Sequence, residues 1–106
     1  MVSDRLQALL GFYEEDPSDS FTRFALALEY GKQGDPSKAI ELLEALRRDD
    51  PTYIGTYYHL AALYRGQGAA DTAEGVYREG IAAADRAKDT HAAAELRSAL
   101  LDLQDT

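Results

Sequence analysis

Two histidines, His59 and His91, are the residues of this chain best suited to acid–base or metal chemistry. The chain has no cysteine, which excludes thiolate ligands, cysteine nucleophiles and disulfides together. Glu95 follows His91 by one helical turn, but this spacing recurs on any polar helix and is typical of a surface contact. Neither histidine belongs to a metal-binding motif, and no nucleophile or phosphate-loop motif occurs. The sequence therefore predicts no enzymatic activity, no metal site and no cofactor.

Charge and hydropathy restrict the partners that the chain can have. The chain has 106 residues, which is enough for one domain, and we expect that domain over 1–106. Its net charge is −8. Nucleic-acid binding needs clustered Lys and Arg, which the chain lacks. No apolar run approaches the length of a membrane span, and the N-terminus does not read as a signal peptide. We expect a soluble, cytoplasmic domain that binds neither nucleic acid nor a membrane.

The acidic surface has two explanations. Acidic residues far outnumber the lysines, Lys32, Lys38 and Lys88, and they are mixed with arginines along the chain. The simpler explanation is a solvated surface that keeps the protein soluble. The alternative is adaptation to a salty cytoplasm, which a flat melting temperature from low to molar salt would exclude.

An internal repeat organises the chain. Asp16-Pro17 recurs as Asp50-Pro51, and Gln33-Gly34 recurs as Gln67-Gly68 at the same interval. Apolar positions follow this interval too: Leu26 and Leu60, Ala27 and Ala61, Tyr30 and Tyr64, Ala39 and Ala73, Leu43 and Tyr77. Turn signals and apolar positions that share one period of about 34 residues predict a helical repeat protein.

Each repeat is expected to form two antiparallel helices. The expected helices are 20–32 and 36–48 in a first repeat over 20–51, and 54–65 and 70–88 in a second repeat over 54–88. Gly34 and Gly68 can adopt the left-handed conformation that ends a helix. Asp35 can then cap the next helix, with Pro36 at its first position.

Two further helices are predicted to flank the repeats. Residues 3–15 carry Leu6, Leu9, Leu10 and Tyr13 at helical spacing, which indicates a half-repeat. Residues 89–104 form a capping helix that starts at Asp89 or Thr90, with an apolar stripe of Ala92, Leu96, Ala99, Leu100 and Leu103. Stacked repeats bury their faces only against neighbours, so both flanking helices are needed to cover the ends.

These residues resemble the tetratricopeptide repeat (TPR), a helix–turn–helix unit of the same length. The matching residues are Leu26, Ala27, Tyr30, Gly34, Ala39, Leu43 and Pro51 in the first copy, and Tyr57, Leu60, Ala61, Tyr64, Gly68, Ala73 and Tyr77 in the second. Arg23 stands where Trp or Leu is usual, Leu46 where a small residue is usual, and Asp85 replaces the closing proline. We expect looser packing in the first repeat and a longer final helix in the second. The resemblance implies an all-α, right-handed α-solenoid of antiparallel helix pairs.

The resemblance also implies a binding site. In TPR proteins the first helices of successive repeats line a concave groove that takes peptide or helical segments of partners. The positions carried over are Phe21, Phe24, Ala25, Leu28 and Lys32 in the first repeat and Tyr58, His59, Ala62 and Arg65 in the second. Their apolar members give the first helix of the repeat a second apolar face, which marks an interaction site or is covered by a terminal helix.

The charged groups of this predicted groove restrict its ligand. Lys32 and Arg65 could pair with an acidic residue of a partner. The Lys and Asn clamp with which some TPR domains hold the C-terminal carboxylate of chaperones is missing, because Phe24, Leu28 and His59 stand at its positions. A hydrophobic or helical ligand fits this set better.

The predicted function is therefore an adaptor or interaction module that binds a peptide or helical segment of another protein. The alternative is a structural module that self-associates, for example as a homodimer, or forms part of a larger assembly. A light-scattering mass across a concentration series separates the two. A stable monomer would disfavour the alternative, and a dimer would weaken the adaptor hypothesis.

Overall fold

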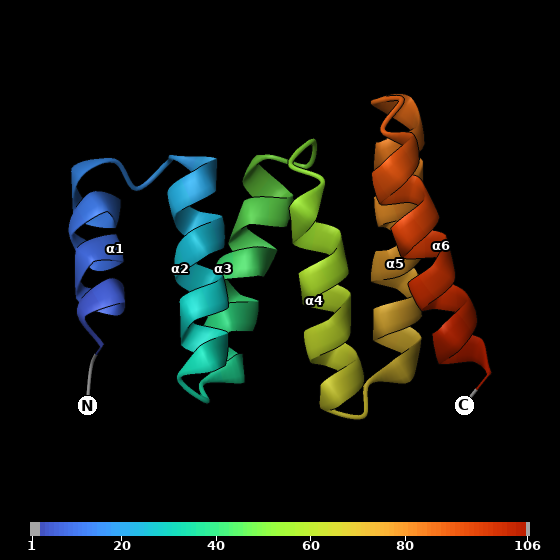
Figure 1. Ribbon diagram of the computed structural model, residues 1–106, viewed down its shortest axis with the longest axis horizontal. Coiled ribbons are helices and arrows are strands. Elements are labelled where there is room, and N and C mark those ends of the chain that lie inside the picture. The colour runs from blue at the N-terminus through green and yellow to red at the C-terminus, as the bar shows by residue number, and fades with distance from the viewer. Residues whose placement is uncertain (1–2, 106) are drawn as a thin grey trace. The chain divides into compact units, whose positions relative to one another are not determined.

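The fold is that of a computed structural model, which describes residues 3–105. Those residues form six α-helices and no strand (Figure 1). The helices are α1 (Asp4–Glu15), α2 (Ser20–Lys32), α3 (Pro36–Asp49), α4 (Gly55–Gly66), α5 (Ala70–Arg86) and α6 (Thr90–Gln104). Each end lies within two residues of its predicted position, and the all-α class is confirmed. No helix in this part of the chain is long and apolar enough to cross a membrane.

The helices gather into two compact units, one up to Asp50 and one from Pro51 onward. The first unit contains α1, α2 and α3, and the second contains α4, α5 and α6. The expectation of one domain over 1–106 stays a prediction.

The turns inside the two repeats follow the signals in the sequence. Gly34 and Gly68 have φ angles of 81° and 79°, a left-handed conformation that side chains disfavour. In both turns the amide just after the glycine donates to a carbonyl five residues earlier, at 3.0 and 2.9 Å, which closes the helix. Asp35 then caps α3 by accepting a hydrogen bond from the Lys38 amide at 3.1 Å. Ala69 gives α5 no such side-chain cap.

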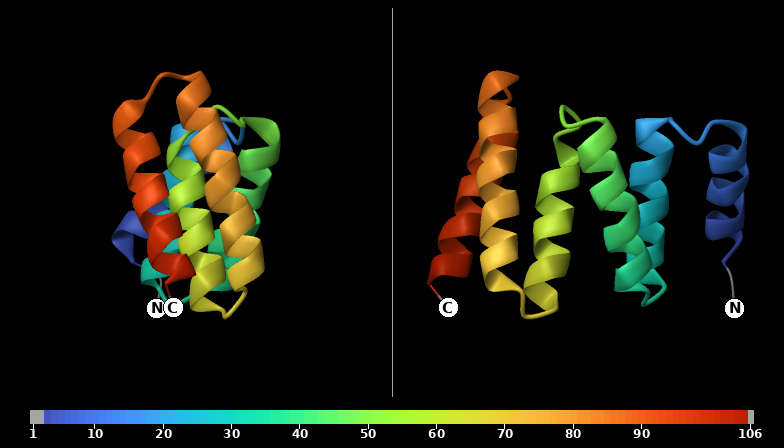
Figure 2. Two further views of the ribbon diagram at one scale, coloured as in Figure 1. Left: turned by 90° about the vertical axis from the view of Figure 1, so that its right-hand side faces the viewer. Right: turned by 180° about the vertical axis from the view of Figure 1, so that it is seen from behind.

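The first unit is held together by close packing of α2 on α3, with α1 against α2 (Figure 2). Ala27 and Ala39 are almost completely buried, and their small side chains let the two helices approach each other closely. α1 adds Leu6 and Leu9 to the core. Leu46, which occupies a position that is usually small, is completely buried.

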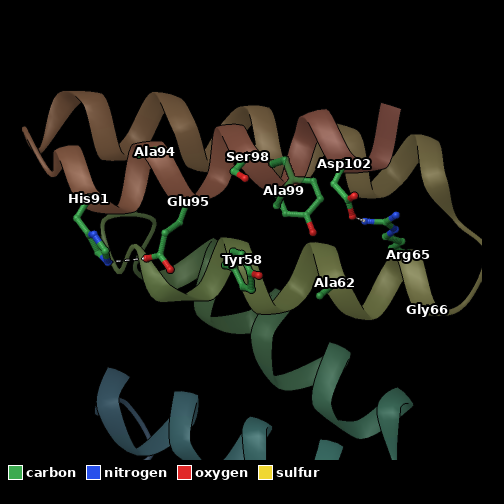
Figure 3. A pocket seen from close by; sticks show the side chains of 11 residues that line it. Tyr58, Ala62, Arg65, Gly66, His91, Ala94, Glu95, Ser98, Ala99 and Asp102 are labelled. Carbon is green, nitrogen blue, oxygen red and sulfur yellow. Dashed lines mark hydrogen bonds and ion pairs between the residues drawn. The ribbon is translucent and has the colours of Figure 1, made fainter. Parts of the chain in front are cut away.

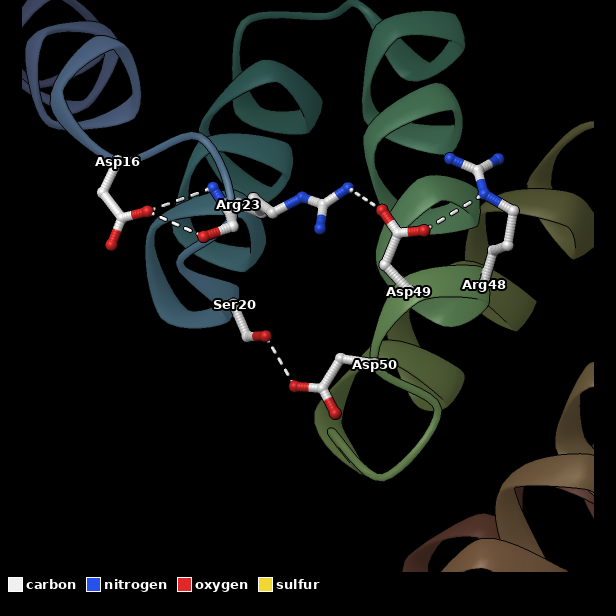
Figure 4. A network of polar contacts seen from close by, with 7 residues as sticks. Asp16, Ser20, Arg23, Arg48, Asp49 and Asp50 are labelled. Atoms are coloured by element: carbon white, nitrogen blue, oxygen red, sulfur yellow. Dashed lines mark hydrogen bonds and ion pairs between the residues drawn. The ribbon is translucent and has the colours of Figure 1, made fainter.

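Arg23 ties α2 to the end of α3. Its side chain is buried, and its Nη2 donates a hydrogen bond to Asp49 Oδ2 at 2.8 Å (Figure 4). This hydrogen bond, together with a smaller contribution from Arg48, holds the pKa of the Asp49 carboxyl below its usual value. Nearby, Ser20 Oγ donates to Asp50 Oδ2. The first repeat therefore uses polar contacts at a position where Trp or Leu is usual.

The second unit is organised around α5, which packs against both α4 and α6 (Figure 2). Tyr57 of α4 takes the place in the second repeat that Arg23 has in the first, and it is only 1% exposed. Its hydroxyl donates to the carbonyl oxygen of Pro51. Gly80 of α5 lies against the start of the Tyr57 side chain. A Cβ atom added at Gly80 would come within 2.5 Å of Tyr57 Cβ and 3.2 Å of Leu96 Cδ1. Gly80 is thus the residue that lets α4 and α5 meet.

α5 and α6 differ in detail from a regular repeat. α5 has 17 residues against 14 in α3, so the second repeat does have the longer final helix. Asp89 caps the start of α6, and its side chain accepts a hydrogen bond from the Ala92 amide at 3.0 Å. The buried side chains of α6 are Ala93, Leu96, Leu100 and Leu103. Of the predicted stripe, Leu96, Leu100 and Leu103 are buried, whereas Ala92 and Ala99 are half-buried.

We predict that Gly80→Ala destabilises the chain by about 1–3 kcal/mol, because the new methyl group overlaps Tyr57 and forces α4 and α5 apart. Gly75→Ala is the matched control on the same helix, where nothing lies within 4 Å of the added Cβ. It should stabilise the chain by about 0.5–1 kcal/mol through helix propensity. Urea unfolding followed by circular dichroism measures both. Equal effects of the two substitutions would show that the contact at Gly80 is not tight.

Candidate functional site

The groove residues predicted in the first unit all lie on α2. Phe21 is 67% exposed and Lys32 is exposed as well, whereas Phe24 and Leu28 are half-buried. Ala25, named with them, is buried in the core. This side of α2 therefore keeps an aromatic ring and a cation accessible.

The groove residues predicted in the second unit lie on α4, and three of them line a pocket. Tyr58, Ala62 and Arg65 form one wall of a pocket of about 950 Å³ (Figure 3). The other wall is α6, which contributes His91, Ala94, Glu95, Ser98, Ala99 and Asp102. Tyr77 of α5 also lines this space, which we call the α4–α6 pocket. His59 lies outside it and lines a neighbouring pocket of about 490 Å³.

Sequence reasoning missed the α6 wall of this pocket. The sequence pattern had indicated α6 only as a capping helix with one apolar stripe. The wall residues recur at intervals of three and four along α6, and so share a second helical face. Three of them, Ala94, Ser98 and Ala99, are small, which keeps the pocket open. This second set of residues at helical spacing is the sequence signal from which the α6 wall could have been predicted.

An ion pair lies at one end of the α4–α6 pocket, and a histidine–carboxylate contact lies at the other. Arg65 Nη1 contacts Asp102 Oδ2 at 2.9 Å, and His91 Nε2 contacts Glu95 Oε1 at 3.1 Å. Figure 3 shows Tyr58 between the two pairs. That Arg65 pairs with an acidic residue of a partner stays a prediction; within the chain, α6 already supplies a carboxylate to Arg65. The His91–Glu95 pair is the surface contact that the sequence suggested.

Aromatic contacts hold Tyr58 in place. Its ring meets His59 edge-to-face at 5.6 Å between centroids and Tyr77 at 6.4 Å. Tyr58 nevertheless remains 42% exposed. Burial raises the pKa of the Tyr77 hydroxyl, which is therefore neutral at physiological pH. The pocket thus presents a fixed, accessible ring.

The side chains that line the pocket are chemically suited to contacts with a ligand. Across residues 3–105, no group of three or more His, Asp or Glu side chains is placed to hold a metal ion. The α4–α6 pocket combines aromatic surface, small side chains, the Arg65–Asp102 ion pair and the His91–Glu95 contact. Such a surface suits a polypeptide ligand with both apolar and charged groups.

The fold defines a class, an all-α helical repeat protein, and the first helix of its second repeat lines a pocket. A tetratricopeptide repeat family model matches residues 32–100. The chain belongs to the tetratricopeptide repeat family, and it is a protein-interaction module. None of the proteins with curated descriptions matches it.

Solved structures support this assignment. A solution structure of a tetratricopeptide repeat domain protein from Salinibacter ruber is 41% identical, with a TM-score of 0.82 over 85% of this chain and 91% of that one. Protein BPP2914 from Bordetella parapertussis is 26% identical, with a TM-score of 0.83 over 99% of this chain and 90% of that one. PcrH in complex with the chaperone binding region of PopD shares the fold at 17% identity, with a TM-score of 0.85 over 94% of this chain and 76% of that one.

We predict that His59 titrates below its ordinary pKa of 6.5, because burial disfavours the charged imidazolium. The unfolded chain then binds a proton before the folded one does. The contribution of neutral His59 to the free energy of unfolding is therefore complete above pH 6.5. It is lost as the pH falls from 6.5 towards the pKa of His59 in the folded state. A proton NMR titration of the imidazole resonances measures the midpoint, and a value at or above 6.5 would contradict the burial.

Proposed function

We propose that the α4–α6 pocket binds a peptide or helical segment of a partner protein in the cytoplasm. One observation carries the proposal, namely that the face of α4 expected to contact partners lines an open pocket. Tyr58, Ala62 and Arg65 reach this pocket, and Tyr58 is kept accessible there. Exposed α2 residues, chiefly Phe21 and Lys32, are proposed as a second contact surface.

The side chains of the pocket suit a helix or an extended peptide. Ala62 on one wall and Ala94, Ser98 and Ala99 on the other let the backbone of a guest approach closely. Tyr58 offers an immobilised ring, which gives contact area at low entropic cost. PcrH, which has the same fold, was solved with a segment of another protein, and this precedent supports a polypeptide ligand.

We expect Tyr58→Ala to weaken partner capture about tenfold, because a central aromatic anchor is lost. The folded state should lose only about 1 kcal/mol, since the ring is partly exposed. Ser98→Trp, which fills the pocket from α6, should abolish capture. The measurement is affinity capture from the source cells, with bound proteins identified by mass spectrometry.

Two matched variants control this experiment. Phe12→Ala removes an exposed ring from α1, and Ala82→Trp adds a ring to an exposed position of α5; both should capture like the wild type. Circular dichroism melts establish that each variant is folded. The same set of partners on Ser98→Trp as on the wild type would refute a role for the pocket.

A further inference from the structure

Carboxylates dominate the charge around the α4–α6 pocket. α6 supplies Glu95 and Asp102, and Asp89 lies in the adjoining smaller pocket. Among the described residues that line the two pockets, Arg65 is the only Lys or Arg, and its guanidinium pairs with Asp102 at 2.9 Å. The pocket therefore has an excess of negative charge.

Glu95 is the carboxylate best placed to receive a cation. Its side chain is 58% exposed, and its contact within the chain is with His91, a residue that is charged only when protonated. The Tyr58 ring, which lies on the facing wall, offers a second attractive surface (Figure 3). A Lys or Arg head group over an aromatic face is attracted by the ring quadrupole. One cation can therefore use the ring and the carboxylate together.

The two pocket carboxylates also set a spacing. Glu95 and Asp102 are seven residues apart on α6, which is about two turns, or roughly 10.5 Å along the axis. Cations seven residues apart on a partner helix lie on one face at the same spacing. Asp102 is 72% exposed and keeps acceptor positions beside its pair with Arg65, so a cation bound there would share the carboxylate with Arg65.

We infer that the segment bound in the α4–α6 pocket is a basic helix of a partner protein, with Lys or Arg at two positions seven residues apart. This inference rests on the proposed function and specifies its ligand. An acidic segment would meet Glu95 and Asp102 with repulsion, and Arg65 would have to leave Asp102 to compensate.

A displayed library of random peptides tests the inference without assuming the ligand. Wild type and Ser98→Trp are selected in parallel, and peptides that prefer the wild type are sequenced. Enrichment of Lys or Arg pairs seven residues apart supports the inference. Preference for acidic or uncharged peptides overturns it and leaves the proposed function standing. If no peptide distinguishes the two proteins, both fail.

A charge-neutral variant measures the role of the carboxylate directly. Glu95→Gln should lower the affinity for an enriched basic peptide about fivefold at low salt. The difference in affinity should shrink as added salt screens the attraction between the carboxylate and the cation. Glu74→Gln is the matched control, since Glu74 contacts Arg78 at 3.1 Å in a similar one-turn pair on α5 and lines neither pocket. It should bind as the wild type does. Equal losses in both variants would mean that only the net charge of the protein matters, which overturns the inference.

Discussion

The contact between Tyr57 and Gly80 determines how the second unit is built. The Tyr57 side chain lies against the backbone of α5 at the one position where a side chain would collide with it, and Leu96 of α6 reaches the same place. All three helices of this unit therefore meet at Gly80. The residues next to these contacts, Tyr58 and Glu95, are on the walls of the pocket. The packing that fixes the helices also fixes the distance between the pocket walls.

The two repeats use different chemistry at the same positions. The first repeat has Arg23 and Leu46 where the second has Tyr57 and Gly80. Arg23 is buried and relies on Asp49 to balance its charge, because an unpaired buried guanidinium would be costly. Tyr57 instead buries a ring and satisfies its hydroxyl with a backbone carbonyl. The departure of the first repeat from the usual pattern is therefore compensated by a polar contact.

Much of the fold could be predicted from the sequence, because its signals are local. The turn glycines Gly34 and Gly68 recur one repeat apart. These glycines and the capping residue Asp35 each act within one or two helical turns of where they occur. The face of α4 was also predictable, since a repeat places equivalent residues on equivalent faces. The partner of Arg65 was not, because Asp102 is distant from it along the chain and meets it only through the packing of α6.

The binding of a partner segment in the α4–α6 pocket is the central claim. Amide chemical shifts of the isotope-labelled chain, recorded while a segment of a captured partner is added, test it most directly. We expect the largest changes to fall on Tyr58, Arg65, Glu95 and Ser98. The claim would be contradicted if the largest chemical-shift changes fell on the exposed side of α3 or α5 and the amide shifts of these four residues did not change.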